Sequence, residues 1–156
     1  MKISTKGRYA LRIMLDVAEH SDEESNVSIK EVANRQSISI KYLEQIVNLL
    51  VKAGFLRSQR GSRGGYRLSR QPSEYTAGDI LRVTEGKMAP VDCLEDEVNM
   101  CPRAKTCQTI KLWEGLNNAI NSYIDSVTLE ELMRDKSQIL IDEENSNDNQ
   151  GFCYTI

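Results

Sequence analysis

Apolar positions recur with a helical period over the first fifty residues and divide that segment into three predicted helices. Between residues 4 and 20 apolar side chains return every three or four positions, until a polar hexapeptide interrupts the pattern. SIKE, which opens the segment 28–36, has the spacing of a capping box and predicts a short second helix. Ser39 can cap a third helix that Gly54 stops. The apolar stripe predicted to be buried on this third helix consists of Ile40, Leu43, Ile46, Val47 and Leu50.

The period changes after the third helix. In FLRSQRGSRGGYRLSR, residues 55–58 and 66–69 alternate as strands do, on either side of a tip rich in glycine and arginine. This pattern predicts a β-hairpin. Two helices joined by a short turn and followed by such a wing make a winged helix-turn-helix, so we expect residues 1–72 to be a DNA-binding region and the fold class to be mainly α with a small β-hairpin wing.

Residues 73–136 are predicted to connect this region to a dimer interface. TAGD at 76–79 begins another helix, a loop bracketed by two prolines follows, and a long helix runs from about 104 to 126. The long helix has more apolar residues than one side of a small domain needs, which suggests a partner helix from a second subunit and hence a homodimer. A last short helix follows, and the polar segment 137–156 is predicted to be a flexible tail.

Charge is distributed unevenly along the chain. Residues 1–70 carry 13 Lys/Arg against 7 Asp/Glu, a net charge of +6, whereas residues 71–156 carry 7 against 16, a net charge of −9. The basic half predicts contact with a polyanion. No segment has the roughly 20 consecutive apolar residues of a membrane-spanning helix, so a cytoplasmic location without membrane contact is expected. No nucleophile–base pair or paired carboxylates stand out, so an enzyme is not expected.

The outward positions of the third helix and the wing are the predicted DNA contacts. Such a helix can enter the major groove, where Glu44 accepting a hydrogen bond from a cytosine amine is the sharpest specificity hypothesis. Arg60 suits the minor groove, although the wing arginines could instead form only a solvated face. Two subunits would require an inverted-repeat operator in double-stranded DNA. The predicted DNA-binding residues are Ser39, Lys41, Tyr42, Glu44, Gln45, Arg60, Ser62, Arg63, Lys2, Lys6 and Arg8.

Three cysteines, Cys93, Cys101 and Cys107, lie within fifteen residues, and Cys153 lies in the tail. In a reducing compartment such cysteines more often bind metal or sense redox state than form disulfides. Seven residues separate the first two and five separate the next two, which is not the C-x-x-C spacing of a zinc ribbon or a thioredoxin-like site. A loose loop with three thiolates better suits a multi-iron cluster.

Several stretches together resemble the IscR/NsrR/CymR family of bacterial winged-helix transcription regulators over residues 1–135. They are MKISTKGRYALRIMLDVA, ISIKYLEQIVNLLVKAGFLRSQRGSRGGYRLSR, AGDILRVTEG and CPRAKTCQTIKLWEGL. In IscR-like members, the resemblance implies, three loop cysteines bind an iron–sulfur cluster that reports iron–sulfur supply, oxygen or nitric oxide and gates operator binding. The matching positions are Cys93, Cys101 and Cys107, with [2Fe–2S] as the expected cluster and [4Fe–4S] as the alternative.

The resemblance does not supply a fourth ligand. IscR has a histidine three residues after the last cysteine, where this chain has Ile110, and NsrR-like members use an N-terminal aspartate of the other subunit, where this chain has Arg8. A carboxylate within 92–97, Cys153, a partner-subunit residue or an exchangeable small ligand stay open. Two further functions also stay open: a cluster-free, CymR-like repressor of cysteine or sulfur metabolism controlled by a partner metabolic enzyme or thiol redox state, and an iron–sulfur or zinc carrier.

Overall fold

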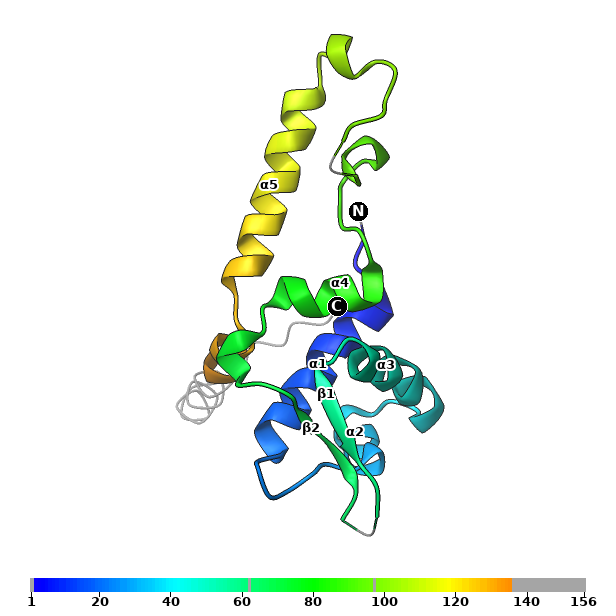
Figure 1. Ribbon diagram of the computed structural model, residues 1–156, viewed down its shortest axis with the longest axis vertical. Coiled ribbons are helices and arrows are strands. Elements are labelled where there is room, and N and C mark those ends of the chain that lie inside the picture. The colour runs from blue at the N-terminus through cyan, green and yellow to red at the C-terminus, as the bar shows by residue number, and fades with distance from the viewer. Residues whose placement is uncertain (1, 62, 97, 136–156) are drawn as a thin grey trace, which may run out of the picture.

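The computed structural model describes residues 2–61, 63–96 and 98–135 (Figure 1). Its two-stranded antiparallel sheet and its helices confirm the predicted fold class, mainly α with a β-hairpin wing. The strands are β1 (Leu56–Gln59) and β2 (Gly65–Leu68). The α-helices are α1 (Thr5–His20), α2 (Ile29–Gln36), α3 (Ile40–Lys52), α4 (Ala77–Glu85) and α5 (Ile110–Ser126), with another at 129–135. The 3-10 turns are η1 (Pro72–Glu74), η2 (Asp92–Leu94) and η3 (Ala104–Thr106).

The predicted starts of α1, α2, α3 and α4 are confirmed, and each follows a residue with a hydroxyl group. The side chains of Ser4, Ser28, Ser39 and Thr76 each accept a hydrogen bond from a backbone N–H of the following first turn. At Ser28 the carboxylate of Glu31 accepts the reciprocal bond, which completes the predicted capping box. Local side-chain chemistry therefore sets where these helices begin.

The core lies where α1, α2, α3 and α4 pack together behind the hairpin (Figure 1). Four of the five stripe residues predicted on α3 are buried, but the prediction was wrong for Ile40, which is 42% exposed. A helical side chain leans toward the N-terminus of its helix. Ile40 is the first residue of α3, so its side chain reaches past the packed part of the helix instead of into the core.

The long helix begins later than predicted. Residues 104–106 form η3, Cys107 has an extended backbone, and α5 begins only at Ile110. The hydroxyl group of Thr109 accepts a hydrogen bond from the indole nitrogen of Trp113 and lies against the thiol of Cys107. These contacts hold Thr109 at the helix start, so Cys107 lies before α5 and not within it.

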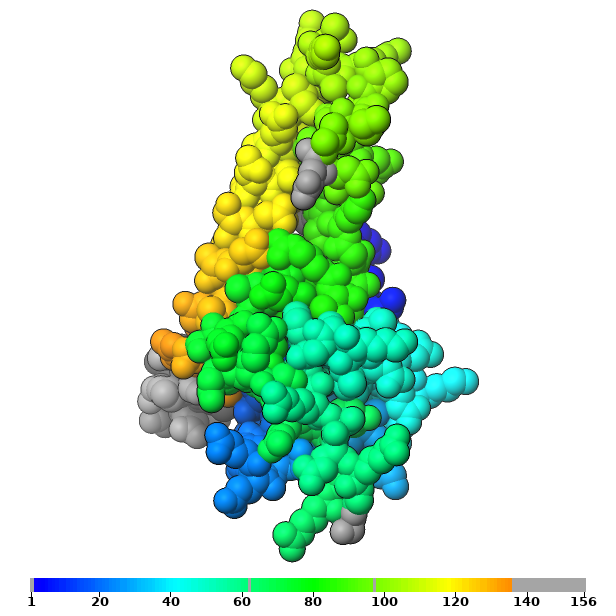
Figure 2. Space-filling view, viewed as in Figure 1, coloured from blue at the N-terminus to red at the C-terminus, as the bar shows by residue number. Residues whose placement is uncertain are grey.

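Helices α1 to α4 and the β-hairpin form the head of the molecule. Helix α5 rises away from the head, with residues 86–96 and 98–109 running beside it (Figure 1). The molecule is therefore elongated in the space-filling view (Figure 2). The guanidinium group of Arg82 fastens α4 to the base of α5 through Asp125 and Asn121. No residue of α5 is buried, and Leu112, Leu116 and Tyr123 are among the exposed apolar residues. This agrees with the prediction that the long helix has more apolar residues than its own chain can cover.

The C-terminal part follows the sequence-based expectation as far as the structure describes it. Thr128 and Glu131 bond each other's backbone N–H groups at the start of the helix 129–135. The predicted flexible tail, 137–156, lies outside the described residues. Within the described ranges, no helix combines the length and apolar character needed to cross a bilayer.

Candidate functional site

One face of α3 presents polar side chains to solvent. Lys41, Glu44, Gln45 and Asn48 follow one another at spacings of three, one and three residues and are all exposed. Ser39 is also exposed, and its hydroxyl group caps the helix through the N–H of Tyr42. In the described part of the chain neither Lys41 nor Glu44 has an ion-pair partner. These side chains are therefore available to bases and phosphates.

Tyr42 differs from the sequence-based expectation that it faces outward. It is half-buried, and its ring packs edge-to-face against that of Tyr9, with the ring centroids 5.9 Å apart. Position 42 lies at the edge of the buried stripe of α3, where the helical period alone does not decide between core and solvent. Tyr42 joins α3 to α1, and only part of its surface is left for DNA.

Arg12 is a residue that sequence reasoning missed. Its guanidinium group donates to the side chain and to the backbone carbonyl of Gln36, both at 2.9 Å, and lies 5.3 Å from the ring centroid of Tyr9. Arg12 therefore ties α1 to the last residue of α2, directly before the turn that leads into α3. The sequence signal that could have indicated it is the spacing of four from Arg8, which places both basic residues on one face of α1.

The wing carries Arg60 and Arg63 at its tip, both exposed. Gly61 has a φ of 114°, and a Cβ atom at Gly64 would lie 2.5 Å from the carbonyl oxygen of Gln59. Only glycine fits these two positions, so the backbone of the tip can turn tightly and approach a ligand closely. Ser62, also predicted to contact DNA, lies outside the described residues.

The predicted N-terminal contacts lie at the other end of the head from the wing tip (Figure 1). Lys2 and Arg8 are exposed and Lys6 is partly exposed. The structure therefore does not gather these three with the wing arginines. It places the start of α1 against the end of α4, where the hydroxyl of Ser4 donates to a carboxylate oxygen of Glu85 at 2.5 Å.

A substitution at Glu44 tests whether the polar face of α3 contacts DNA bases. We expect Glu44→Ala to relax base preference at one operator position, with discrimination falling by about 1–3 kcal/mol, because a carboxylate specifies cytosine through its amine. Lys41→Ala is the matched control and should weaken binding about equally for all sequences. Selection from a random duplex library followed by competition binding measures both. Unchanged preferences in the Glu44 variant would contradict the assignment.

The three cysteines lie on one loop between α4 and α5. Cys93 is in η2, Cys107 follows η3, and Cys101 lies between them; all three are free thiols of intermediate burial. In the part of the chain that the structure describes, no three His, Cys, Asp or Glu side chains are close enough together to hold a metal ion. Of the residues considered as a fourth ligand, Asp96 pairs with Lys87, whereas Glu97 and Cys153 lie outside the described residues.

The thiol of Cys107 lies against the hydroxyl group of Thr109. Hydrogen bonding from the side chain and backbone of Thr109 stabilises the thiolate and lowers the pKa of Cys107. A lowered pKa means that the thiolate forms at lower pH than in an ordinary cysteine. A thiolate that forms more readily is the form that binds metal and that is oxidised.

Alkylation measures this effect. In cluster-free protein, we expect the rate at which iodoacetamide modifies Cys107 to rise at lower pH than in the Thr109→Ala variant, in which the hydroxyl group is lost. Thr106→Ala is the control, because the Thr106 hydroxyl bonds the carbonyl of Arg103 and not the thiol. Mass spectrometry of the 101–107 peptide gives the rates. Coincident pH profiles for all three proteins would refute the role of Thr109.

Comparison with known proteins assigns the chain to a protein family. A family described as "Rrf2: Iron-dependent Transcriptional regulator" matches residues 3–135. The chain belongs to the Rrf2 family. It is thus a DNA-binding transcription regulator and, as predicted from the sequence, not an enzyme.

The relatives of the chain include two named regulators, CymR and IscR. The chain is 46% identical to the HTH-type transcriptional regulator CymR of Bacillus subtilis, over 85% of this chain and 89% of the relative. It is 37% identical to the HTH-type transcriptional regulator IscR of Vibrio atlanticus, over 99% and 89%. The solved structure of the global cysteine regulator CymR of B. subtilis has a TM-score of 0.71 at 44% identity, covering 86% of this chain and 97% of that one. The predicted family resemblance is confirmed.

Proposed function

We propose that the protein is a homodimeric transcription regulator whose cysteine loop binds an iron–sulfur cluster and thereby controls operator binding. The observation that carries the proposal is the arrangement of the loop: three free thiols lie on a segment that begins at the end of α4 and leads into α5. One end of this segment adjoins the DNA-binding head and the other adjoins the exposed apolar helix. A change in the loop therefore acts on both.

The link from the loop to the head passes through Glu85. Its carboxylate accepts hydrogen bonds from the hydroxyl group and the backbone N–H of Ser4, the residue that caps α1. The next residue, Gly86, has a φ of 73°, and the loop starts there. A displacement of the loop backbone thus moves the carboxylate on which α1 begins, and α1 packs against α3 through Tyr9 and Tyr42.

The donor set fits the cluster in its chemistry, although the thiols are not gathered into a site in the described residues. Cys93, Cys101 and Cys107 would hold the cluster as thiolates, and the hydrogen bonds that lower the pKa of Cys107 favour that form. A bound cluster would supply a centre that reacts with oxygen or nitric oxide, and its presence would depend on the iron–sulfur supply. We propose a [2Fe–2S] cluster, with [4Fe–4S] as the alternative. Its fourth ligand would be a carboxylate within 92–97, Cys153, a partner-subunit residue or an exchangeable small ligand.

Anaerobic purification followed by iron and sulfide analysis tests the cysteine assignment. We expect a coloured protein with stoichiometric acid-labile sulfide, and a colourless but folded variant when the three loop cysteines are replaced by serine. Met100→Ser is the matched control, because it alters an 81% exposed side chain of the same loop without removing a thiol.

Measurements of operator binding test whether the cluster controls DNA binding. The cluster-loaded and cluster-free forms should differ in affinity for a selected DNA site by about tenfold or more, the usual size of allosteric coupling. The triple serine variant should bind like the cluster-free form. Identical binding profiles with and without the cluster would end the gating proposal.

A second candidate is a cluster-free repressor of cysteine or sulfur metabolism, controlled by a partner enzyme or by thiol oxidation. The 46% identity to CymR and the lowered pKa of Cys107 favour it. A protein that stays colourless after reconstitution, and whose DNA binding responds to oxidation of Cys107, would give this candidate first place. The family assignment gives no support to an iron–sulfur or zinc carrier.

The remaining sequence-based expectations stay predictions. They are the inverted-repeat operator, the cytoplasmic location, and the division into a DNA-binding region (1–72), a connecting and dimerisation region (73–136) and a tail (137–156). Selection of operator sequences by the purified protein would test the first, because a two-fold dimer selects two half-sites of opposite direction.

A further inference from the structure

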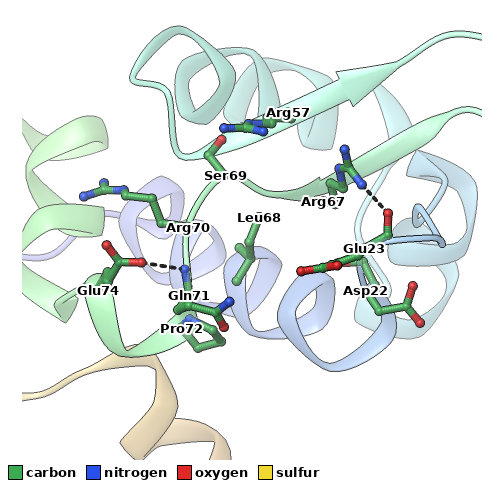
Figure 3. Close-up of a pocket in the computed structure, with 11 residues that line it drawn as sticks. Asp22, Glu23, Arg57, Arg67, Leu68, Ser69, Arg70, Gln71, Pro72 and Glu74 are labelled. Atoms are coloured by element: carbon green, nitrogen blue, oxygen red, sulfur yellow. Dashed lines mark hydrogen bonds between the residues drawn. The ribbon is translucent and has the colours of Figure 1, made fainter.

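A hollow with a volume of about 790 Å³ opens between the base of the wing, the loop that follows α1, and η1 (Figure 3). Its size lies in the range of small-molecule sites, about 300–1,000 Å³. It is lined by charged groups of both signs, with Leu68 and Pro72 between them. The charged lining residues are Arg57, Arg67, Arg70, Asp22, Glu23 and Glu74.

Two of the arginines face each other across the hairpin. Arg57 and Arg67 are direct partners in the register of β1 and β2, so their side chains project from the same face of the sheet. Like charges in directly opposite positions destabilise a strand pair. In the described residues neither guanidinium group has a carboxylate partner; Arg67 donates to the backbone carbonyl of Glu23, and Arg57 donates no hydrogen bond. The pair is therefore unneutralised.

The wall beside this pair is rigid. The guanidinium group of Arg70 lies over the rings of Phe55 and Tyr75, 5.4 and 4.6 Å from their centroids. The hydroxyl group of the fully buried Tyr75 accepts hydrogen bonds from the N–H groups of Ser69 and Arg70. The strand end that carries Ser69 into the hollow is thus held in one position.

The acidic groups differ in how far their charge is already engaged. The carboxylate of Asp22 accepts from the N–H groups of Glu24 and Ser25, and that of Glu74 accepts from the N–H of Gln71. The carboxylate of Glu23 has no hydrogen bond or ion pair in the described part of the chain. The hollow therefore has an open cationic end, at Arg57 and Arg67, and an open anionic group at Glu23.

We propose that this hollow binds a small zwitterionic metabolite with one carboxylate and one ammonium group, in the size class of a free amino acid. The carboxylate would lie between Arg57 and Arg67, which offer charge-assisted hydrogen bonds, and the ammonium group at Glu23. A plain anion would match only the arginines and would be repelled by the three carboxylates. The bound molecule bridges the wing to the loop after α1, so it restrains the strands that carry Arg60. The site is separate from the cysteine loop and does not depend on a cluster.

Ligand binding to the full chain tests the proposal. The probes are the free L-amino acids, one at a time, with propionate and ethylamine as single-charge controls. At least one amino acid should raise Tm with increasing concentration, because a ligand that binds only the folded state stabilises it. Neither control should do so at equal concentration.

Variants localise the site. Arg57→Gln and Glu23→Gln should each weaken the affinity measured by calorimetry about 10- to 100-fold, the value of one hydrogen bond to a charged group. Both side chains are exposed, and circular dichroism verifies that the variants fold. Lys30→Gln, an exposed charge on α2, should leave the affinity unchanged.

Three results would overturn the proposal. The first is that no amino acid raises Tm, and the second is that the affinity survives in both variants. The third is that Arg57→Gln leaves amino-acid binding unchanged but weakens binding to a mixed-sequence duplex and lowers the salt slope by about one. That outcome would make Arg57 a phosphate contact of the DNA instead.

Discussion

Replacing Asp16 by alanine is expected to lower the free energy of unfolding by about 2–4 kcal/mol. Asp16 is 1% exposed and accepts hydrogen bonds from Arg35 at 2.6 Å and from Gln36 at 2.7 Å. Removing one partner of a buried ion pair typically costs about 3–5 kcal/mol. The expected cost is smaller here, because the side chain of Arg35 is 32% exposed and water can replace part of the lost interaction.

Urea denaturation followed by circular dichroism measures this loss. Glu130→Ala is the matched control, because it removes the carboxylate of an exposed pair with Arg134 and should cost no more than about 0.5 kcal/mol. Equal losses in the two variants would mean that the Asp16 network contributes no more than a surface pair.

The same carboxylate makes stability depend on pH. Burial raises the pKa of Asp16, but the hydrogen bonds from Arg35 and Gln36 and the charge of Arg35 outweigh it and hold the pKa below its usual value of 3.8. As pH falls, the carboxylate of Asp16 is therefore protonated at a higher pH in the unfolded chain than in the folded protein. The stabilisation is complete above about pH 3.8 and is lost as pH falls through the lower pKa of the folded state. The Asp16→Ala variant should lack this part of the acid dependence.

Replacing Leu112, Leu116 and Tyr123 together by serine is expected to convert the dimer into a monomer and to weaken operator binding about 10²- to 10⁴-fold. These side chains are 62, 42 and 71% exposed on one face of α5, a helix that buries none of its residues within the chain. A second subunit that covers this face would bury their apolar surface. Loss of the dimer removes the second DNA-binding head and the effective concentration that it gains from the first.

Sedimentation equilibrium measures the oligomeric state, and competition binding measures the affinity. The matched control replaces Lys111, Glu114 and Asn118 by serine, because these exposed polar residues lie on the opposite side of α5. The control should stay dimeric. A triple apolar variant that is still a dimer would show that another surface holds the subunits together.

The elements that were predicted correctly are those whose cause is local. Ser4, Ser28, Ser39 and Thr76 each bond the first turn of their own helix, so a few neighbouring residues define each start. The burial of Ile40 and the start of α5 were predicted wrongly. In both cases the position depends on what packs at the end of a helix, and the apolar period does not report that.

The candidate site could be predicted only in its chemistry. The spacing of the cysteines indicates ligands, but it does not indicate whether the loop gathers them, because segments distant in sequence fix the course of the loop. Tyr42 was assigned to the outer face because it lies outside the apolar stripe of α3. The contact that half-buries it is with Tyr9 on another helix, which the period of α3 does not report. The opposed pair of Arg57 and Arg67 likewise follows from the strand register, which depends on the length of the wing turn.

The contact between Glu85 and Ser4 connects the start of α1 to the start of the cysteine loop. The helix has 16 residues and is thus about 24 Å long, so a tilt of about 5° at Ser4 displaces the other end by about 2 Å. Beyond that end, Val27 pairs with Tyr66 of the wing strand. If the cysteine loop controls DNA binding as proposed, a change in the loop that tilted α1 by this amount would reach the wing as a movement of about 2 Å.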